Sequence, residues 1–492
     1  MLETTNRYSA AVGHRFALQS LLAYFSTLIM AFSASPNAVA KEFLIRPGDE
    51  TRAIAKEVTA GDAIVLKDGE WQDAKLAFER LPGTSDAPIE IRPQTPGGVR
   101  LTGATEFRIS GSYVHLNGFV FRNCGDVSDV VQFRTHSERL AENCRISNCS
   151  FEESDNFQNP IESRWLSIYG KSNRIDHCYF AGKKNRGTTL VVWVTKTPGQ
   201  HRIDHNHFGP RPELGRNGGE TIRIGTSDVS ELDSQTRVEH NYFDRCNGEA
   251  EIVSNKSCGN VYRRNLFEQC SGALTLRHGH RCWVDGNIFL GKQSRGTGGV
   301  RIIGQGHRVT NNYFEGLRGD AERAAVCFMN GVPDGELNTY SPVRDAEVSH
   351  NTMIDCKVSM EFGVGEGGDQ TANPSDSRIR NNVFAPGKWS TFRVQAEPRN
   401  FLWKGNKHQP KWKDDSKWMA MELVDLPFER ASDGLLRPTD VESLVVSGDA
   451  WLEKDIDYQS RGEQVIAGCD DPSTSRATWP SADNTGPTWK SR

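Results

Sequence analysis

The clearest pattern along the chain is a short segment that recurs with apolar and polar residues at fixed positions. Every copy has Asn or Cys at its sixth position and Phe or Met at its eighth, and most have an aliphatic residue at the third. The copies are CRISNCSF (144–151), NRIDHCYF (173–180), HRIDHNHF (201–208), TRVEHNYF (236–243), NVYRRNLF (260–267), CWVDGNIF (282–289), HRVTNNYF (307–314), AEVSHNTM (346–353) and SRIRNNVF (377–384). Such a repeat predicts one supersecondary unit per copy, stacked on its neighbours.

The repeat alternates between apolar and polar residues as a strand does, which predicts an all-β solenoid rather than a helical array. A leucine ladder, typical of leucine-rich repeats, is absent. In a parallel β-helix equivalent residues of successive coils stack, so the Phe row is expected in the core. The Asn row is expected to form an internal hydrogen-bonded ladder, with Cys149 and Cys178 in the same row. Its members are Asn206, Asn241, Asn265, Asn287, Asn312, Asn351 and Asn382.

The two ends of the solenoid differ from its body. Residues 50–60 read as a short amphipathic helix that caps the first coil, since an open end exposes strand edges and core. The solenoid domain is expected over 41–470, although the pattern weakens beyond about residue 400. Residues 471–492 are rich in Ser, Thr and Pro and are predicted to be a disordered tail.

The N-terminus reads as a targeting segment. Basic residues precede the apolar run FALQSLLAYFSTLIMAF, and small residues at 38 and 40 precede Lys41. This predicts a signal peptide over 1–40, cleavage near Ala40 and export to the periplasm or the medium. An uncleaved anchor is the alternative, and no other stretch is expected to span a membrane.

Charge and cysteine content narrow the range of ligands. The formal net charge is −4, which argues against a nucleic-acid binder. Between Lys256 and Arg308, however, nine Lys or Arg stand against two acids, which favours a site for an anionic ligand. Eleven cysteines cannot all pair within one chain, and most are expected to be buried thiols.

The segment NGEAEIVSNKS (247–257) contains the candidate chemistry. Glu249 and Glu251 share one face of the expected strand, and Lys256 follows five residues later. Adjacent carboxylates repel each other, so either one keeps its proton or a cation lies between them. One coil upstream, RNGGETIRIG adds Asn217 and Glu220. An amide oxygen with carboxylates is a typical Ca²⁺ ligand set, whereas a glycosidase-type acid pair is the alternative.

Four segments, NGGETIRIG, EAEIVSNKS, LTLRHG and GGVRIIG, resemble polysaccharide lyase family six, the chondroitinase B and alginate lyase family. The resemblance spans roughly residues 41–470 and implies a right-handed parallel β-helix. It also implies that Asn217, Glu249 and Glu251 bind Ca²⁺, that Lys256 is the catalytic base and Arg277 the catalytic acid, and that His278 and Arg301 contact substrate. A late family motif similar to DIDGQxR is DIDYQSR (455–461) here, with Tyr458 in place of Gly.

The expected activity is β-elimination on an anionic uronate polymer by a monomeric enzyme. A cation neutralises the C6 carboxylate, Lys256 takes the C5 proton, and Arg277 assists the leaving oxygen. Alginate is the expected substrate and dermatan sulfate the alternative. A β-helix glycoside hydrolase and a non-catalytic polysaccharide-binding solenoid are further alternatives. The sequence does not distinguish mannuronate from guluronate preference or endo from exo cutting.

Overall fold

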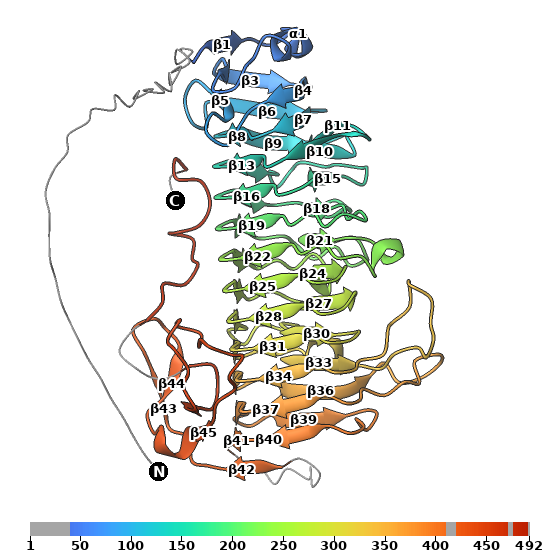
Figure 1. Cartoon of the computed structure of the whole chain (residues 1–492), viewed down its shortest axis with the longest axis vertical. Coiled ribbons are helices and arrows are strands. Elements are labelled where there is room, and N and C mark those ends of the chain that lie inside the picture. Colours follow the sequence, from blue (N-terminus) through green and yellow to red (C-terminus); the bar gives the residue numbers. More distant parts are fainter. Residues whose placement is uncertain (1–39, 410–419, 471–475, 491–492) are drawn as a thin grey trace, which may run out of the picture. The chain divides into compact units, whose positions relative to one another are not determined.

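Three long β-sheets form the walls of a parallel β-helix (Figure 1). This computed structural model describes residues 40–409, 420–470 and 476–490. Each coil of the chain contributes one strand to each sheet in turn, so strands that pair are separated by a whole coil. The predicted right-handed parallel β-helix is confirmed. The predicted signal peptide lies outside the described residues, apart from Ala40.

Sheet 1 contains fourteen parallel strands. They are β1 (Glu42–Ile45), β2 (Ala63–Leu66), β5 (Ile89–Pro93), β8 (Val114–Asn117), β13 (Arg145–Ser147), β16 (Arg174–Asp176), β19 (Arg202–Asp204), β22 (Arg237–Glu239), β25 (Val261–Arg263), β28 (Trp283–Asp285), β31 (Arg308–Thr310), β34 (Glu347–Ser349), β37 (Arg378–Arg380) and β40 (Leu402–Lys404).

Sheet 2 follows sheet 1 in each coil and also has fourteen strands. They are β3 (Gly69–Gln72), β6 (Val99–Gly103), β9 (Val120–Cys124), β14 (Ser150–Glu152), β17 (Tyr179–Ala181), β20 (His207–Phe208), β23 (Tyr242–Asp244), β26 (Leu266–Glu268), β29 (Ile288–Leu290), β32 (Tyr313–Glu315), β35 (Thr352–Ile354), β38 (Val383–Ala385), β41 (Asn406–His408) and β42 (Met421–Leu423).

Sheet 3 completes the coil and carries the candidate site described below. Its strands are β4 (Lys75–Pro82), β7 (Glu106–Ser112), β10 (Asp129–Gln132), β11 (Arg134–His136), β12 (Arg139–Glu142), β15 (Arg164–Ile168), β18 (Leu190–Val192), β21 (Ile222–Ile224), β24 (Glu251–Lys256), β27 (Ala273–His278), β30 (Val300–Ile302), β33 (Val326–Met329), β36 (Val358–Val364) and β39 (Ser390–Val394). All pairings in this sheet are parallel except that of β11 with β12.

The sequence repeat corresponds to the corner between sheets 1 and 2. The predicted Asn ladder forms there: Asn265, for example, receives hydrogen bonds from the backbone and side-chain amides of Asn241, both at 3.0 Å. Its own side-chain amide donates to Asn287 Oδ1 and to the Val238 carbonyl, both at 2.9 Å. Asn406 extends the row that the sequence predicted. The residue before each Asn has a positive φ, and this left-handed conformation bends the chain sharply at the corner.

Replacing Asn265 by leucine is expected to destabilise the protein strongly. It would leave the buried backbone amide of Asn241 without its acceptor and remove the side-chain bonds of Asn265 to Val238 and Asn287, at about 1–3 kcal/mol for each group left unsatisfied. Urea unfolding should therefore shift to clearly lower concentration. Asn338→Leu, at an exposed loop position, is the control and should unfold near wild type. Equal midpoints for the two variants would contradict a structural ladder.

The core contains the predicted column of aromatic rings. Phenylalanines 121, 151, 180, 208, 243, 267, 289 and 314 stack with ring centroids 4.4–5.1 Å apart. All eleven cysteines are buried and free, as the sequence predicted for most of them. Cys178 donates its backbone amide to Asn206 Oδ1 at 3.0 Å, which confirms that it belongs to the Asn row.

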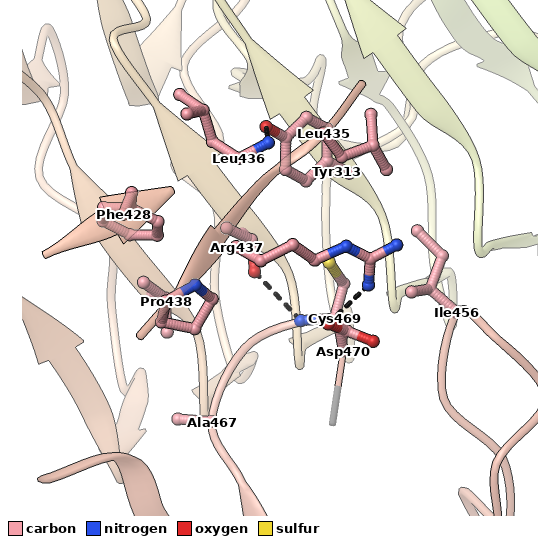
Figure 2. A pocket seen from close by; sticks show the side chains of 12 residues that line it. Tyr313, Phe428, Leu435, Leu436, Arg437, Pro438, Ile456, Ala467, Cys469 and Asp470 are labelled. Carbon is pink, nitrogen blue, oxygen red and sulfur yellow. Dashed lines mark hydrogen bonds and ion pairs between the residues drawn. The ribbon is translucent and has the colours of Figure 1, made fainter. Parts of the chain in front are cut away.

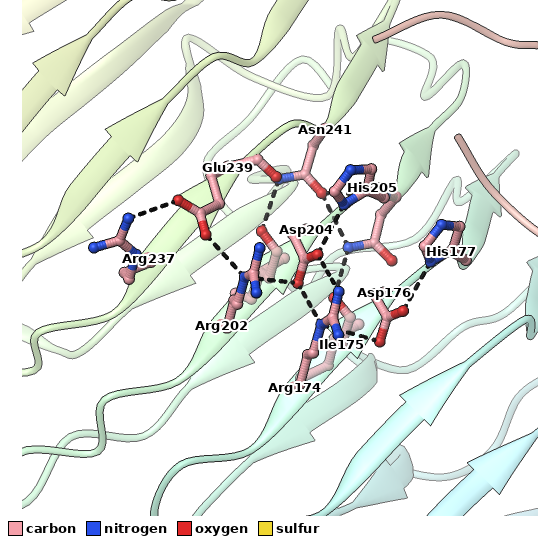
Figure 3. Close-up of polar contacts among 12 residues, drawn as sticks. Arg174, Ile175, Asp176, His177, Arg202, Asp204, His205, Arg237, Glu239 and Asn241 are labelled. Carbon is pink, nitrogen blue, oxygen red and sulfur yellow. Dashed lines mark hydrogen bonds and ion pairs between the residues drawn. The ribbon is translucent and has the colours of Figure 1, made fainter. Parts of the chain in front are cut away.

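An ion-pair ladder covers part of the outer face of sheet 1 (Figure 3). Arg174 donates to Asp204 at 2.8 and 2.6 Å, and Arg202 lies 2.8 Å from Glu239. The neighbouring His177, His205 and His240 rings stack with centroids 5.2 Å apart. A row of arginines thus runs beside a row of acids, and each arginine pairs with an acid of the next coil, so the charges on this face neutralise one another.

Short helical segments lie at the start of the solenoid, between its coils and near its C-terminal end. The predicted capping helix is α1 (Thr51–Ala55), and 3₁₀ turns occur at Ser227–Val229, Ala321–Arg323 and Glu442–Leu444. No helix in the described ranges is long and apolar enough to cross a membrane. Two hairpins, β43 (Phe428–Arg430) with β44 (Leu436–Pro438) and β45 (Val445–Ser447) with β46 (Gln464–Ile466), occupy the region where the sequence pattern weakened.

The C-terminal segment packs against the solenoid through buried charges and aromatic rings. Arg437 forms ion pairs with Asp457, at 2.9 Å, and with Asp470, which faces it in Figure 2. Tyr458 has φ +66°, a conformation that favours the glycine of the family motif, and Arg264 lies 4.0 Å above its ring. Stacking on Arg264 gives this tyrosine a packing role that glycine lacks.

Residues 476–490 belong to the segment predicted to be a disordered tail, and its disorder stays a prediction. They form no regular element, but the Trp489 indole donates to the Asn148 carbonyl at 2.7 Å. The Gly486 amide donates to the His205 carbonyl at 3.0 Å. Trp489 thus supplies a contact between this segment and the solenoid.

Candidate active site

Six of the seven predicted site residues line one open hollow on the outer face of sheet 3. The hollow has a volume of about 440 Å³. It contains Asn217, Glu249, Glu251, Lys256, Arg277 and Arg301, together with Glu213, Arg216, Arg323 and Tyr340. Glu251 and Lys256 lie on β24, Arg277 on β27 and Arg301 on β30. These strands are direct neighbours in the sheet, so the coil spacing expected from the sequence is confirmed.

Two irregularities in strand pairing aim the key side chains outward. Glu251 pairs with Ala273 and Val253 with Leu274, so Ile252 is an extra residue, and both Ile252 and Val253 pack in the core. Further along, Asn255 pairs with Leu276 but Lys256 pairs with His278, which leaves Arg277 as the extra residue. β-Bulges re-aim side chains in this way and are common beside active sites.

Glu249 reaches the hollow from the turn before β24 rather than from the strand itself, which differs from the expected Glu-x-Glu strand face. Its Oε2 accepts hydrogen bonds from the backbone amides of Gly218 and Gly219, at 2.8 and 3.1 Å. A side chain at Gly219 would meet the Gly248 carbonyl oxygen at 2.4 Å, so the approach of the two turns requires glycine. Burial and the nearby Glu220 and Glu251 carboxylates raise the pKa of Glu249 to about 7.

Glu251 is a candidate Ca²⁺ ligand that also contacts the arginines of the hollow. It accepts a hydrogen bond from Ser254 Oγ at 2.5 Å. Its Oε1 is 3.4 Å from Arg277 Nε and 3.7 Å from Arg301 Nη1. The carboxylate therefore orients both arginines.

Lys256 and Arg277 both have unused hydrogen-bonding capacity in the hollow. No described residue forms a hydrogen bond or ion pair with the Lys256 ammonium. Arg277 Nη1 is buried and has no hydrogen-bond partner among the described residues. Burial lowers the pKa of Arg277, and the positive charge of Arg301 acts in the same direction. An amine and a guanidinium with free donors, side by side in an open hollow, suit an anionic ligand.

Tyr340 is a site residue that the sequence did not reveal. The Arg277 guanidinium lies 4.0 Å from the centre of its ring, and its hydroxyl accepts a hydrogen bond from Arg301 at 2.8 Å. It comes from the long segment between β33 and β34, outside the repeat. No motif or spacing in the sequence linked it to Arg277.

His278 is not among the residues that line the hollow. It is 2% exposed, and its Nε2 lies 3.2 Å from Ser227 Oγ. Burial, with the positive charges of Arg277 and Lys256, lowers its pKa to about 3, so the imidazole is neutral at physiological pH. Its expected contact with substrate stays a prediction.

The predicted basic stripe of residues 256–308 is dispersed over several faces. Arg263 pairs with Asp285 on sheet 1, Arg281 with Asp233, and Lys292 with Glu268 on sheet 2. Only Lys256, Arg277 and Arg301 of this set reach the hollow. One coil spans three sheets, so charges that are close in sequence point in different directions.

The residues at the acidic end of the hollow fit a hard divalent cation. Asn217, Glu249 and Glu251 present amide and carboxylate oxygens to one open space, and the crowded carboxylates raise the pKa of Glu249. Within the described residues, no group of three or more His, Cys, Asp or Glu is arranged as a metal site. The predicted ligand set contains only two carboxylates and an amide, so the assignment of a cation site depends on the oxygen atoms that these three residues present.

The chain is similar in sequence and fold to solved polysaccharide lyases of family 6. The PL6 family alginate lyase AlyGC is 34% identical, with a TM-score of 0.82, and the match covers 92% of this chain and 59% of that chain. The chain thus spans 59% of the length of AlyGC. A mannuronic acid specific polysaccharide family 6 lyase from human gut microbiota is 32% identical, with a TM-score of 0.66 and coverage of 79% and 92%.

A more distant PL6 alginate lyase, solved in complex with a trisaccharide, shares the fold at 22% identity and a TM-score of 0.71, covering 91% of this chain and 95% of that chain. No curated protein compared with the chain matches it. The family model described as Chondroitinase B matches residues 47–416, which is most of the chain. The chain therefore belongs to the chondroitinase B family, which the four sequence segments around the hollow already resembled.

Proposed function

We propose that this protein is a polysaccharide lyase that cleaves alginate by Ca²⁺-assisted β-elimination. The observation that carries the proposal is that Lys256 and Arg277 lie on adjacent strands and line one hollow with an oxygen-ligand set. Family membership supports the reaction class, and the relatives described as alginate lyases support the polymer. Dermatan sulfate, also a polyuronate, is the alternative substrate.

The reaction requires a base, a proton donor and a way to hold a carboxylate. Lys256, in its neutral form, accepts the proton from C5 of the uronate. The electron pair forms the C4–C5 double bond, the C4–O4 bond breaks, and Arg277 donates a hydrogen bond or proton to the departing O4. Arg301 and Tyr340 hold Arg277 in place and present further donors to the sugar.

Asn217, Glu249 and Glu251 would hold Ca²⁺, which when bound neutralises the substrate carboxylate and so makes the C5 proton more acidic. The Gly218 and Gly219 amides fix the Glu249 carboxylate in this position. Ser254 fixes Glu251. These contacts orient the ligand oxygens before any ion arrives, which reduces the cost of ordering them on binding.

The outer face of sheet 3 supports a polymeric rather than a small substrate. Lys256 aligns with Gly225 in the preceding coil, and the two coils before that carry Trp193 and Tyr169 at the same position. The Trp193 and Tyr169 rings stack with their centroids 5.7 Å apart. Arg134 lies 3.8 Å from the centre of the Tyr169 ring. A chain of sugars that follows the solenoid axis would pass these polar and aromatic edges on its way to Lys256.

Ultraviolet absorbance during digestion tests the proposal. Poly-mannuronate, poly-guluronate and dermatan sulfate, each incubated separately with the protein and Ca²⁺, distinguish the substrates. Elimination creates a conjugated double bond, so ultraviolet absorbance should rise while poly-mannuronate or poly-guluronate is digested. New reducing ends without absorbance would indicate a hydrolase, for which the raised pKa of Glu249 would suit a general acid. No new ends with any polymer would contradict both.

We also propose that the protein is exported, on the basis of its N-terminal basic, apolar and small-residue regions. A polymeric substrate outside the cell agrees with this placement. Mass spectrometry of the protein secreted by its host would reveal whether the mature chain begins at Lys41.

A further inference from the structure

Arg211 is a buried cation beside the candidate site that the proposed mechanism does not use. It follows β20 at the corner between sheets 2 and 3 and is 3% exposed. None of the described carboxylates forms an ion pair with it. The Glu220, Glu249 and Glu153 carboxylates act on its charge without a direct ion pair, so its hydrogen bonds must compensate for much of the lost hydration.

Its guanidinium is satisfied by backbone oxygens from two successive coils. Nη1 donates to the Glu220 carbonyl at 2.6 Å, and Nη2 donates to the carbonyls of Gly187 and Asn185 at 2.9 and 3.1 Å. Thr189 Oγ1 accepts a further bond from Nη1 at 3.3 Å. The planar fork of arginine can reach all these acceptors at once, whereas a lysine ammonium cannot match that geometry.

These bonds close the base of the turn that carries the metal-site candidates. The chain leaves the solenoid after Arg211 and returns at Glu220, and the segment between them includes Asn217, Gly218 and Gly219. The Arg211–Glu220 bond joins the two ends of this excursion. On the other side, the backbone amide of Asn247 donates to the Arg211 carbonyl at 2.9 Å. Arg211 thus connects the Asn217 turn with the turn that carries Glu249.

The packing between the two turns leaves no room for movement. A Cβ added at Gly248 would meet the Gly219 carbonyl oxygen at 2.2 Å and Arg211 Nε at 2.9 Å. The Leu214 amide also donates to the Gly248 carbonyl at 3.0 Å. A shift of the Arg211 side chain would therefore move both turns relative to each other.

We propose that Arg211 is a positioning residue for the cation site: it holds the 212–219 turn so that Asn217 and the Gly218 and Gly219 amides meet Glu249. The inference rests on the Ca²⁺ site of the proposed function. Arg211 acts through the turn, since its guanidinium is enclosed by protein oxygens and does not line the hollow. Outer residues that orient metal ligands typically change metal affinity by about 10–100-fold when they are replaced.

The experiment compares Arg211→Met and Arg211→Lys with wild type and with Arg264→Met. Arg264 is a matched control, because it is also 3% exposed and its guanidinium donates to a backbone carbonyl, that of Ile456, far from the hollow. Calorimetric titration of the metal-free proteins with Ca²⁺ gives the affinity. Limited trypsin digestion without metal gives the rate of cleavage after Arg216, which is exposed at the tip of the turn.

Both Arg211 variants are expected to bind Ca²⁺ about 10–100-fold more weakly and to be cut faster after Arg216. Arg264→Met should lower the thermal midpoint without either change. Wild-type affinity and wild-type cleavage in both Arg211 variants would overturn the proposal, as would equal effects in Arg264→Met. If wild type itself binds no Ca²⁺, the metal part of the proposed function fails, and the cleavage rate after Arg216 then decides whether Arg211 holds the turn.

Discussion

Replacing Lys256 by alanine is expected to lower kcat by about 10²–10⁴-fold, the usual contribution of a general base. KM for the polymer should change little, since Arg277, Arg301 and the cation would still bind the uronate carboxylates. The ammonium has no partner among the described residues, so its loss leaves no buried group unsatisfied and folding should be normal. Initial rates of double-bond formation at saturating Ca²⁺ measure the effect.

Two further variants make this result specific. Lys256→Arg should not restore the rate, because a guanidinium stays protonated at any workable pH and cannot accept the C5 proton. Lys292→Ala is the matched control, because Lys292 pairs with Glu268 on sheet 2, away from the hollow. Near-normal elimination by Lys256→Ala would assign the base to another residue and remove the main support for the mechanism.

The sequence predicted the solenoid because its stabilising contacts repeat with the chain. Asn265 bonds to Asn241 and Asn287 through the same atoms in each coil, and Phe267 stacks on Phe243 and Phe289. A periodic structure of this kind imposes a periodic sequence. The coil spacing then placed Lys256 next to Arg277 on one wall, which the strand pairing confirms.

The parts of the site that interrupt the period could not be predicted in this way. The extra residues Ile252 and Arg277 break strict alternation, and the repeat gives no sign of them. Tyr340 reaches Arg277 from an insertion more than sixty residues later, and His278 turns inward where an outward side chain was expected. Each depends on a local backbone shift or a long loop, and both are set by tertiary packing.

Calcium is expected to bind more tightly as the pH rises from about 5 to about 8. The pKa of Glu249 is raised to about 7, so below this value the carboxyl keeps a proton that the cation must displace. The sign for stability is opposite in the metal-free protein: an acid whose folded pKa is raised loses stability as the pH rises through this range. The Ca²⁺-induced increase in the thermal midpoint, measured at several pH values, should therefore grow with pH.

Chelation supplies the functional arm of this prediction: elimination should stop in excess chelator and return when Ca²⁺ is added. Glu251→Gln should weaken Ca²⁺ binding more than it lowers the thermal midpoint, because a solenoid distributes its stability over many coils. Asp470 also has its pKa raised to about 7, but it pairs with Arg437 in the C-terminal segment. Its titration affects the thermal midpoint equally with and without Ca²⁺ and so does not change the Ca²⁺-induced increase. Glu429→Gln, in the exposed strand β43, is the matched charge control. Full activity in excess chelator, or a Ca²⁺-induced shift that is the same at every pH, would exclude Glu249 and Glu251 as ligands of a catalytic cation.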